Sequence, residues 1–167
     1  AASDVYKRQK FTIDLSFDIA LKEEVYGNQN AMKPPAIHTI KGTRILLVED
    51  NDLNAEIAEF ILEDMGLMVD RVEDGVQCVS RIEQKPAGTY DLILMDIQMP
   101  NMDGYRATEM IRGLSDKDKA TIPIIAMTAN AFEEDRKKAL AKGMNGHIAK
   151  PVDAEKVEKT ICGVLSR

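Results

Sequence analysis

Residues 90–108 read YDLILMDIQMPNMDGYRAT, and this stretch decides the fold class. The run from Leu92 to Met95 is short and continuously apolar, which is typical of a parallel strand buried on both faces. Asp96 follows this run, and a helical pattern extends from Tyr105 to Arg112. A buried strand that leads into a helix is part of a strand-helix-strand unit, so the stretch predicts an α/β protein.

The same alternation continues on both sides of this stretch. Arg44 to Val48 and Ile124 to Met127 are further apolar runs, while Met68 to Val72 and His147 to Ala149 are weaker strand candidates. Helical patterns follow the strands within 53–65, 76–82, 105–112, 131–142 and after Asp153. Five such pairs predict a three-layer sandwich with right-handed crossovers and ligands beyond the carboxyl ends of the strands.

The first expected helix has its larger apolar side chains on one face and ends at Gly66. These side chains are Leu53, Ile57, Phe60, Ile61 and Met65. Because an amphipathic helix of a globular protein turns its apolar stripe to the core, we expect this face to be the buried one.

Composition and charge narrow the class of protein. The chain has 167 residues, 44% of them hydrophobic, and its 22 basic and 28 acidic residues give a net charge of −6. This acidic balance disfavours nucleic acid and anionic membranes as partners. No apolar run approaches the roughly 18 residues of a membrane span, and no secretory pattern opens the chain, so we expect a cytoplasmic location.

The residues before 43 lack the strand-helix alternation. Residues 10–17 alternate apolar and polar side chains, which indicates one half-buried strand. A lone strand needs sheet partners, so we interpret the chain as the end of a larger protein. Residues 26–41 hold Gly, Asn, Gln and a Pro-Pro pair and indicate a linker, while the DVYKRQ motif suggests that residues 1–9 are a non-native leader.

Polar residues follow four of the five expected strands. They are Glu49 and Asp50, then Asp96, then Thr128, and finally Lys150 with Pro151. Because the carboxyl ends of parallel strands meet at one edge of a sheet, we expect these side chains to converge. Crowded carboxylates need a cation and favour Mg²⁺, and a lysine and a threonine suit the oxygens of a phosphoryl group. Asp96 is the natural nucleophile, because a carboxylate attacks phosphorus without a general base.

Each of these residues also has an ordinary structural interpretation. Acidic residues favour helix N-termini, as Glu49 and Asp50 would, and Thr128 suits a helix cap. Asp96 suits the start of a turn, and Lys150 suits a solvated strand end. Their joint position at strand ends favours a functional site over separate structural roles.

The stretches 44–54, 90–108, 122–135 and 143–153 together resemble the response-regulator receiver domain, in the form attached to hybrid sensor histidine kinases. The resemblance implies a flavodoxin-like (βα)5 fold with strand order 2-1-3-4-5. The strand KFTIDLSF resembles the closing strand of the ATP-binding domain of a histidine kinase. The implied organisation is a leader at 1–9, a kinase remnant at 10–21, a linker at 22–42 and a receiver domain at 43–167.

The resemblance also implies roles for the strand-end residues. Asp96 would accept phosphate from a phosphohistidine. Asp50 and Asp96 would hold Mg²⁺ or Mn²⁺ with the main-chain carbonyl of Gln98, and Glu49 would act through water. Lys150 would bind a phosphate oxygen or pair with Asp96.

Further implied roles concern switching and phosphate lifetime. Thr128 would move toward the phosphoryl group, and the bond before Pro151 would be cis. Gln98 and Asn130 would flank the attacking water. His147 stands where many receivers carry Tyr or Phe, so it is either a polar switch residue with a weak pH sensitivity or a partly exposed strand residue.

The predicted function is a phosphorelay receiver that switches the face made by the fourth helix, fifth strand and fifth helix. Its partner would be a kinase core in cis, a histidine phosphotransfer protein, or both, docking near the first helix. We expect self-phosphorylation and slow self-dephosphorylation rather than turnover of a free substrate, with a histidine kinase as the parent protein. Two alternatives are a non-phosphorylated interaction module and a haloacid dehalogenase-type phosphatase, although Gln98 stands where the latter needs a second Asp.

Overall fold

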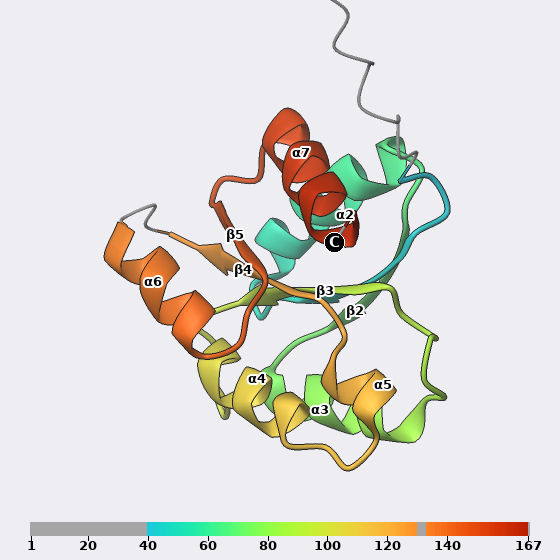
Figure 1. The fold of residues 1–167 in the computed structure, drawn as a ribbon. Coiled ribbons are helices and arrows are strands. Elements are labelled where there is room, and N and C mark those ends of the chain that lie inside the picture. The colour runs from blue at the N-terminus through green and yellow to red at the C-terminus, as the bar shows by residue number, and fades with distance from the viewer. Residues whose placement is uncertain (1–39, 130–132, 167) are drawn as a thin grey trace, which may run out of the picture. The chain divides into compact units, whose positions relative to one another are not determined.

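Residues 40–129 and 133–166 are described by a computed structural model (Figure 1). The predicted leader 1–9, the predicted strand remnant 10–21 and most of the linker 22–42 lie outside the described residues, and so does Asn130.

Five parallel strands form one sheet in the order β2-β1-β3-β4-β5, which confirms the predicted flavodoxin-like topology. The central strand β3 is buried along its whole length, as its continuous apolar run predicts. The strands are β1 Arg44–Val48, β2 Met68–Val72, β3 Leu92–Asp96, β4 Ile124–Thr128 and β5 Gly146–Ala149.

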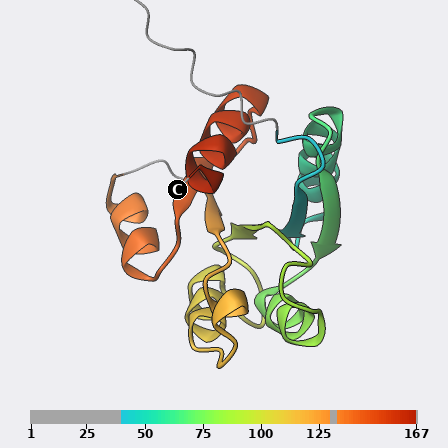
Figure 2. The same ribbon diagram turned by 45° about the vertical axis from the view of Figure 1, so that its right-hand side comes forward.

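Helices cover both faces of this sheet, so the three-layer prediction is confirmed (Figures 1 and 2). One face carries α2 and α7, and the other carries α3 and α4. The described helices are α2 Asp52–Asp64, α3 Gly75–Gln84, α4 Gly104–Arg112, α5 Lys117–Ala120, α6 Glu133–Ala141 and α7 Ala154–Leu165. The short helix α5 was not predicted, because its sequence KDKA shows no apolar periodicity. Its N-terminus is stabilised by the side chain of Asp116, which caps it.

The buried face of α2 differs from the predicted one. Its buried residues are Ala55, Ala58 and Leu62, whereas Leu53 and Phe60 are 65% and 73% exposed. Two alanines let the helix backbone approach the sheet closely, and the larger apolar side chains then point to solvent. The helix ends as predicted, with Gly66 in the left-handed region just after it.

The folded unit begins earlier than the predicted boundary at residue 43. Ile40 is 5% exposed and packs in the core beneath α2 and α7. The N–H of Gly42 donates to the carbonyl of Gly66 at 2.8 Å, which ties this segment to the turn before β2.

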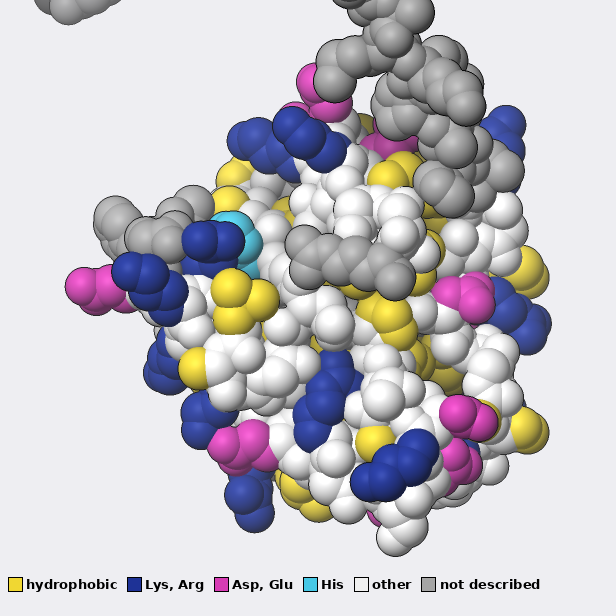
Figure 3. Space-filling view, viewed as in Figure 1, with side chains coloured by type: hydrophobic (Ala, Val, Ile, Leu, Met, Phe, Trp, Pro, Cys, Tyr) yellow, Lys and Arg dark blue, Asp and Glu magenta, His cyan; other side chains and the backbone are white. Residues whose placement is uncertain are grey.

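The described surface is mixed in charge. On the face seen in Figure 3, basic and acidic side chains are interspersed rather than gathered in one patch. Within the described ranges, no helix combines the length and apolarity needed to cross a bilayer.

Candidate functional site

Three carboxylates meet at the carboxyl ends of the central strands. Glu49 and Asp50 follow β1, and Asp96 ends β3. One carboxylate oxygen of each lies within 4.8 Å of the others. Glu49 and Asp96 are buried, at 1% and 6% exposure, while Asp50 is open to solvent. The structure therefore brings together the acidic residues that the strand pattern singled out.

Lys150 bridges the two buried carboxylates. Its Nζ donates to Asp96 Oδ2 and to Glu49 Oε2, each at 2.6 Å. Burial lowers the pKa of Lys150, but the hydrogen bonds and charges of Asp96 and Glu49 raise it more, so its pKa lies above the ordinary value. The lysine is held as a cation against the predicted nucleophile.

Two side chains that the sequence analysis missed hold the β1 end of the site. Asn54 Nδ2 donates to Glu49 Oε1 at 3.0 Å, and the Arg71 guanidinium donates twice to the Glu49 carbonyl at 3.2 and 3.3 Å. Arg71 also contacts Asp52 at 2.7 Å. Asn54 lies in the first turn of α2, directly after a predicted strand end, and that position was the available signal.

The loop after β3 lies tightly against Asp96. The N–H of Gln98 donates to Asp96 Oδ1 at 3.1 Å, so each carboxylate oxygen of Asp96 has its own donor. The N–H of Gly104 donates to the Ile97 carbonyl at 3.0 Å and closes the loop. A Cβ at Gly104 would lie 2.2 Å from the Asp96 main-chain oxygen, so α4 begins pressed against the end of β3.

The remaining predicted site residues lie on β4, on β5 and just beyond. Thr128 ends β4, and its carbonyl accepts the Lys150 N–H at 2.7 Å. His147 is half-buried on β5, opposite Ala126. The bond from Lys150 to Pro151 is cis, the geometry that the resemblance implies.

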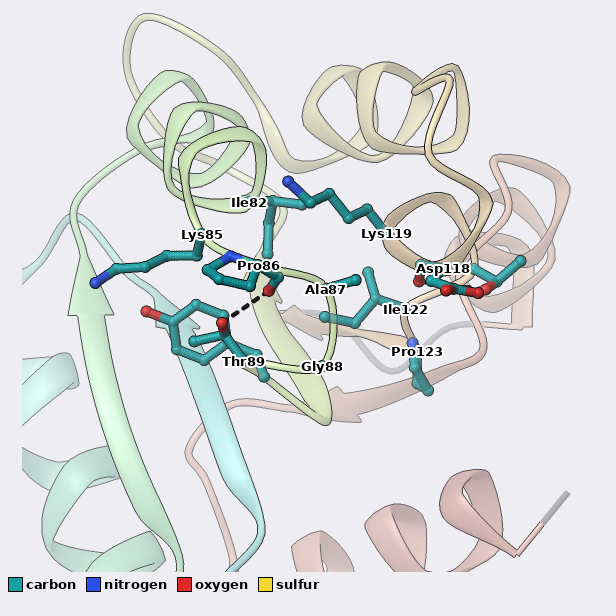
Figure 4. Close-up of a pocket in the computed structure, with 12 residues that line it drawn as sticks. Ile82, Lys85, Pro86, Ala87, Gly88, Thr89, Asp118, Lys119, Ile122 and Pro123 are labelled. Carbon is teal, nitrogen blue, oxygen red and sulfur yellow. Dashed lines mark hydrogen bonds between the residues drawn. The ribbon is translucent and has the colours of Figure 1, made fainter.

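Two surface hollows lie at opposite ends of the strands. One of about 410 Å³ is lined by Asp50 and Gln98 together with Tyr105 and Lys138, and so opens beside the carboxylates. The other, of about 380 Å³, lies between the segments 85–90 and 118–123, before β3 and β4 begin (Figure 4). Of these two hollows, only the first is lined by a residue of the carboxylate cluster, Asp50.

Comparison with known proteins identifies the family of this chain. A sequence profile described as the response regulator receiver domain matches residues 45–162. The chain belongs to the response regulator receiver domain family. The matching profile and the fold thus confirm the family that the sequence resembles.

The similar proteins include sensor kinases and their receiver domains. Over 142 residues the chain is 37% identical to the signal transduction histidine-protein kinase BarA of Escherichia coli strain K12, an alignment that covers 85% of this chain and 15% of BarA. The receiver domain of a sensor histidine kinase of Pseudomonas aeruginosa PAO1, which has a magnesium ion coordinated in its active site cleft, is 40% identical with a TM-score of 0.67. That match covers 75% of this chain and 99% of the other.

A third similar structure is a complex. It contains the Saccharomyces cerevisiae histidine phosphotransfer signaling protein Ypd1 and the receiver domain of its downstream response regulator Ssk1. The match has a TM-score of 0.67 and 28% identity, and covers 75% of this chain and 90% of the other. Our chain is therefore a receiver domain related to those of hybrid histidine kinases in phosphorelay signalling.

Proposed function

We propose that this receiver domain accepts a phosphoryl group from a phosphohistidine onto Asp96 in a Mg²⁺-dependent step. The observation that carries the proposal is the environment of the Asp96 carboxylate, which Lys150 Nζ binds from one side and the Gln98 N–H from the other. These two donors orient a nucleophile that needs no general base.

The donor set fits Mg²⁺. Three carboxylates and one ammonium leave two uncompensated negative charges, which a divalent cation neutralises, and hard oxygen ligands are those that Mg²⁺ prefers. We assign Asp50, Asp96 and the Gln98 carbonyl as its protein ligands, with Mn²⁺ as a substitute. Glu49 already accepts from Lys150 and Asn54, which favours contact through water. When bound, the metal would neutralise charge between the carboxylate and the phosphoryl oxygens.

In the transfer, an Asp96 oxygen attacks phosphorus and the bond from phosphorus to the histidine nitrogen breaks, leaving that nitrogen with the electron pair. Lys150 then binds a phosphoryl oxygen, and the Thr128 hydroxyl donates to another. Because Thr128 and Lys150 end β4 and follow β5, their shift alters the face made by α6, β5 and α7. Gln98 and Asn130 would flank the water that slowly hydrolyses the acyl phosphate. His147 would be either a polar switch residue or a partly exposed strand residue without a switching role.

Intact-protein mass spectrometry tests the acceptor. Incubation with acetyl phosphate, and separately with a phosphohistidine donor, is expected to add one phosphoryl group of about 80 Da only when Mg²⁺ is present. Asp96→Asn should show no adduct with either donor.

Asp91→Asn is the matched control for this measurement, because Asp91 directly precedes β3 at its other end and bonds the Arg44 N–H there. It should be phosphorylated like the wild type. If neither donor phosphorylates the wild-type chain, the acceptor role is wrong and a non-phosphorylated interaction module is the better function.

The exposed apolar face of α2 supports a histidine-bearing partner. Leu53, Ile57 and Phe60 are 65%, 46% and 73% exposed. Ile57 also lines a small hollow with Glu49 and Lys150, so this face is continuous with the acceptor site. We propose that a histidine phosphotransfer protein or the kinase core docks here; the Ypd1–Ssk1 complex supports a partner of this kind.

Ile57→Asn is expected to slow phosphoryl transfer from the protein donor about tenfold or more, because it places an amide in the centre of the apolar contact. Phosphorylation by acetyl phosphate should not change. Met110→Asn is the control, since Met110 is 39% exposed on α4, on the other face of the sheet. Rapid-quench assays with both donors measure the rates, and equal slowing with both would argue against docking on α2.

A further inference from the structure

Asp74 is a buried carboxylate outside the acceptor site. It follows β2, is 6% exposed and uses its two oxygens for different purposes. Oδ1 accepts the Gln77 N–H at 2.8 Å and caps α3, while Oδ2 accepts Asn101 Nδ2 at 2.8 Å. The second bond is not needed for a helix cap.

Asn101 belongs to the loop 97–103, which carries Gln98. Its φ is +61°, in the left-handed region that asparagine tolerates better than most residues. One residue further on, the Met102 carbonyl accepts the Gly75 N–H at 3.2 Å. A Cβ at Gly75 would lie 2.7 Å from that oxygen, so the start of α3 and the loop 97–103 are in direct contact here. Asp74 and Gly75 thus hold two consecutive loop residues, a contact that we name the loop tether.

The loop is closed at its base as well. The N–H of Gly104 donates to the Ile97 carbonyl at 3.0 Å, and the N–H of Met102 donates to the Pro100 carbonyl at 2.6 Å. With both its base and its tip fixed, the loop has little freedom to move Gln98. The Gln98 main chain supplies the N–H on Asp96 and, in the proposed site, a carbonyl ligand of the metal.

We propose that Asp74 and Asn101 are positioning residues that set the Mg²⁺ affinity of the acceptor site through the loop tether. This inference rests on the proposed metal site. Mg²⁺ demands near-ideal octahedral geometry, so a small shift of the Gln98 carbonyl weakens binding. Partners that orient metal ligands typically contribute 10–100-fold to affinity.

The helix cap and the loop tether can be separated by substitution. Asp74→Ser keeps a good N-cap for α3 but is too short to reach Asn101. Asn101→Gly keeps the freedom to adopt positive φ and removes the amide. Asn101→Asp keeps the shape and places a carboxylate against a carboxylate.

The experiment is a Mg²⁺ titration of the whole chain, followed by isothermal calorimetry and by the backbone amide signal of Gln98. Asp74→Ser and Asn101→Gly should each weaken Mg²⁺ binding about tenfold, and Asn101→Asp should weaken it further. The Gln98 amide should already be shifted without metal in all three variants, although each is still folded at the working temperature.

Two reference variants distinguish failure of the loop tether from failure of the proposed metal site. Asp116→Ser changes the N-cap of α5, whose carboxylate accepts only from the N–H groups of Asp118 and Lys119 among the described residues. Because this cap is local to α5, the Mg²⁺ affinity of the variant should match that of the wild type. Asp50→Asn removes a proposed ligand and should weaken binding most. Wild-type affinity in Asp74→Ser and Asn101→Gly, with weak binding in Asp50→Asn, would overturn the tether alone. Wild-type affinity in Asp50→Asn would overturn the metal site and the tether together.

Discussion

Lys150→Met is expected to lower the free energy of unfolding by about 2–4 kcal/mol at neutral pH and to prevent phosphorylation of Asp96. The Lys150 ammonium lies 2.6 Å from both Glu49 and Asp96, whose side chains are 2% and 8% exposed. Removing the cation leaves two buried carboxylates without their compensating charge, and methionine fills a similar volume. Urea denaturation at pH 7 followed by circular dichroism measures the loss.

The difference in unfolding free energy between the wild type and Lys150→Met should depend on pH in a definite direction. The pKa of Lys150 is raised in the folded protein, so its stabilisation is complete below the ordinary lysine pKa of 10.5 and is lost as the pH rises through the raised value. The wild type should therefore approach the stability of the variant in strongly alkaline solution.

Lys159→Met is the control, since Lys159 is exposed on α7 and its substitution should change stability by less than about 0.5 kcal/mol. A loss below about 1 kcal/mol in Lys150→Met would contradict the bridging role of Lys150.

The polar residues at the carboxyl edge of the sheet could be predicted, because the sequence pattern that marks them is local. Each central strand is a continuous apolar run that stops at a polar residue, so Asp50, Asp96 and Thr128 were recognised by where the runs end. Lys150 follows a weaker strand candidate at the edge of the sheet. The parallel order then brings residues from distant parts of the chain to one edge.

Contacts between loops could not be predicted in this way. The Asp74–Asn101 hydrogen bond joins residues 27 positions apart, and neither residue ends an apolar run. The pairing depends on how the loops after β2 and β3 bend, which a pattern of apolar residues does not specify. Asp74 is recognisable from the sequence only as a helix cap.

The face of α2 was predicted wrongly for a different reason. Apolar periodicity identifies a stripe, but it does not say whether a protein core or a partner covers that stripe. In α2 the small residues Ala55 and Ala58 face the sheet, while Leu53 and Phe60 remain exposed. The failure of the simple rule therefore coincides with the surface on which we propose that the phosphoryl donor docks.

Gly104→Ala is expected to destabilise the domain by about 3 kcal/mol, because the new methyl group has no space. It would lie 2.2 Å from the Asp96 main-chain oxygen and 2.9 Å from Met95 Cγ. Either α4 must move away from β3 or the end of β3 must shift, and both changes displace the acceptor carboxylate. Phosphorylation by acetyl phosphate should therefore also fall in the variant at temperatures where it remains folded.

Gly163→Ala is expected to change stability in the opposite direction. It therefore separates the effect of losing a glycine from the effect of the close contact at Gly104. Gly163 lies within α7 and a Cβ there would meet nothing within 4 Å, so alanine should stabilise the helix by about 0.5–1 kcal/mol. Thermal and urea denaturation of both variants compare the two substitutions directly. Opposite signs would show that contact with Asp96, rather than the loss of a glycine, causes the damage at Gly104. Wild-type stability in Gly104→Ala would mean that α4 can move away from β3 at little cost, which would contradict the rigid placement of Asp96.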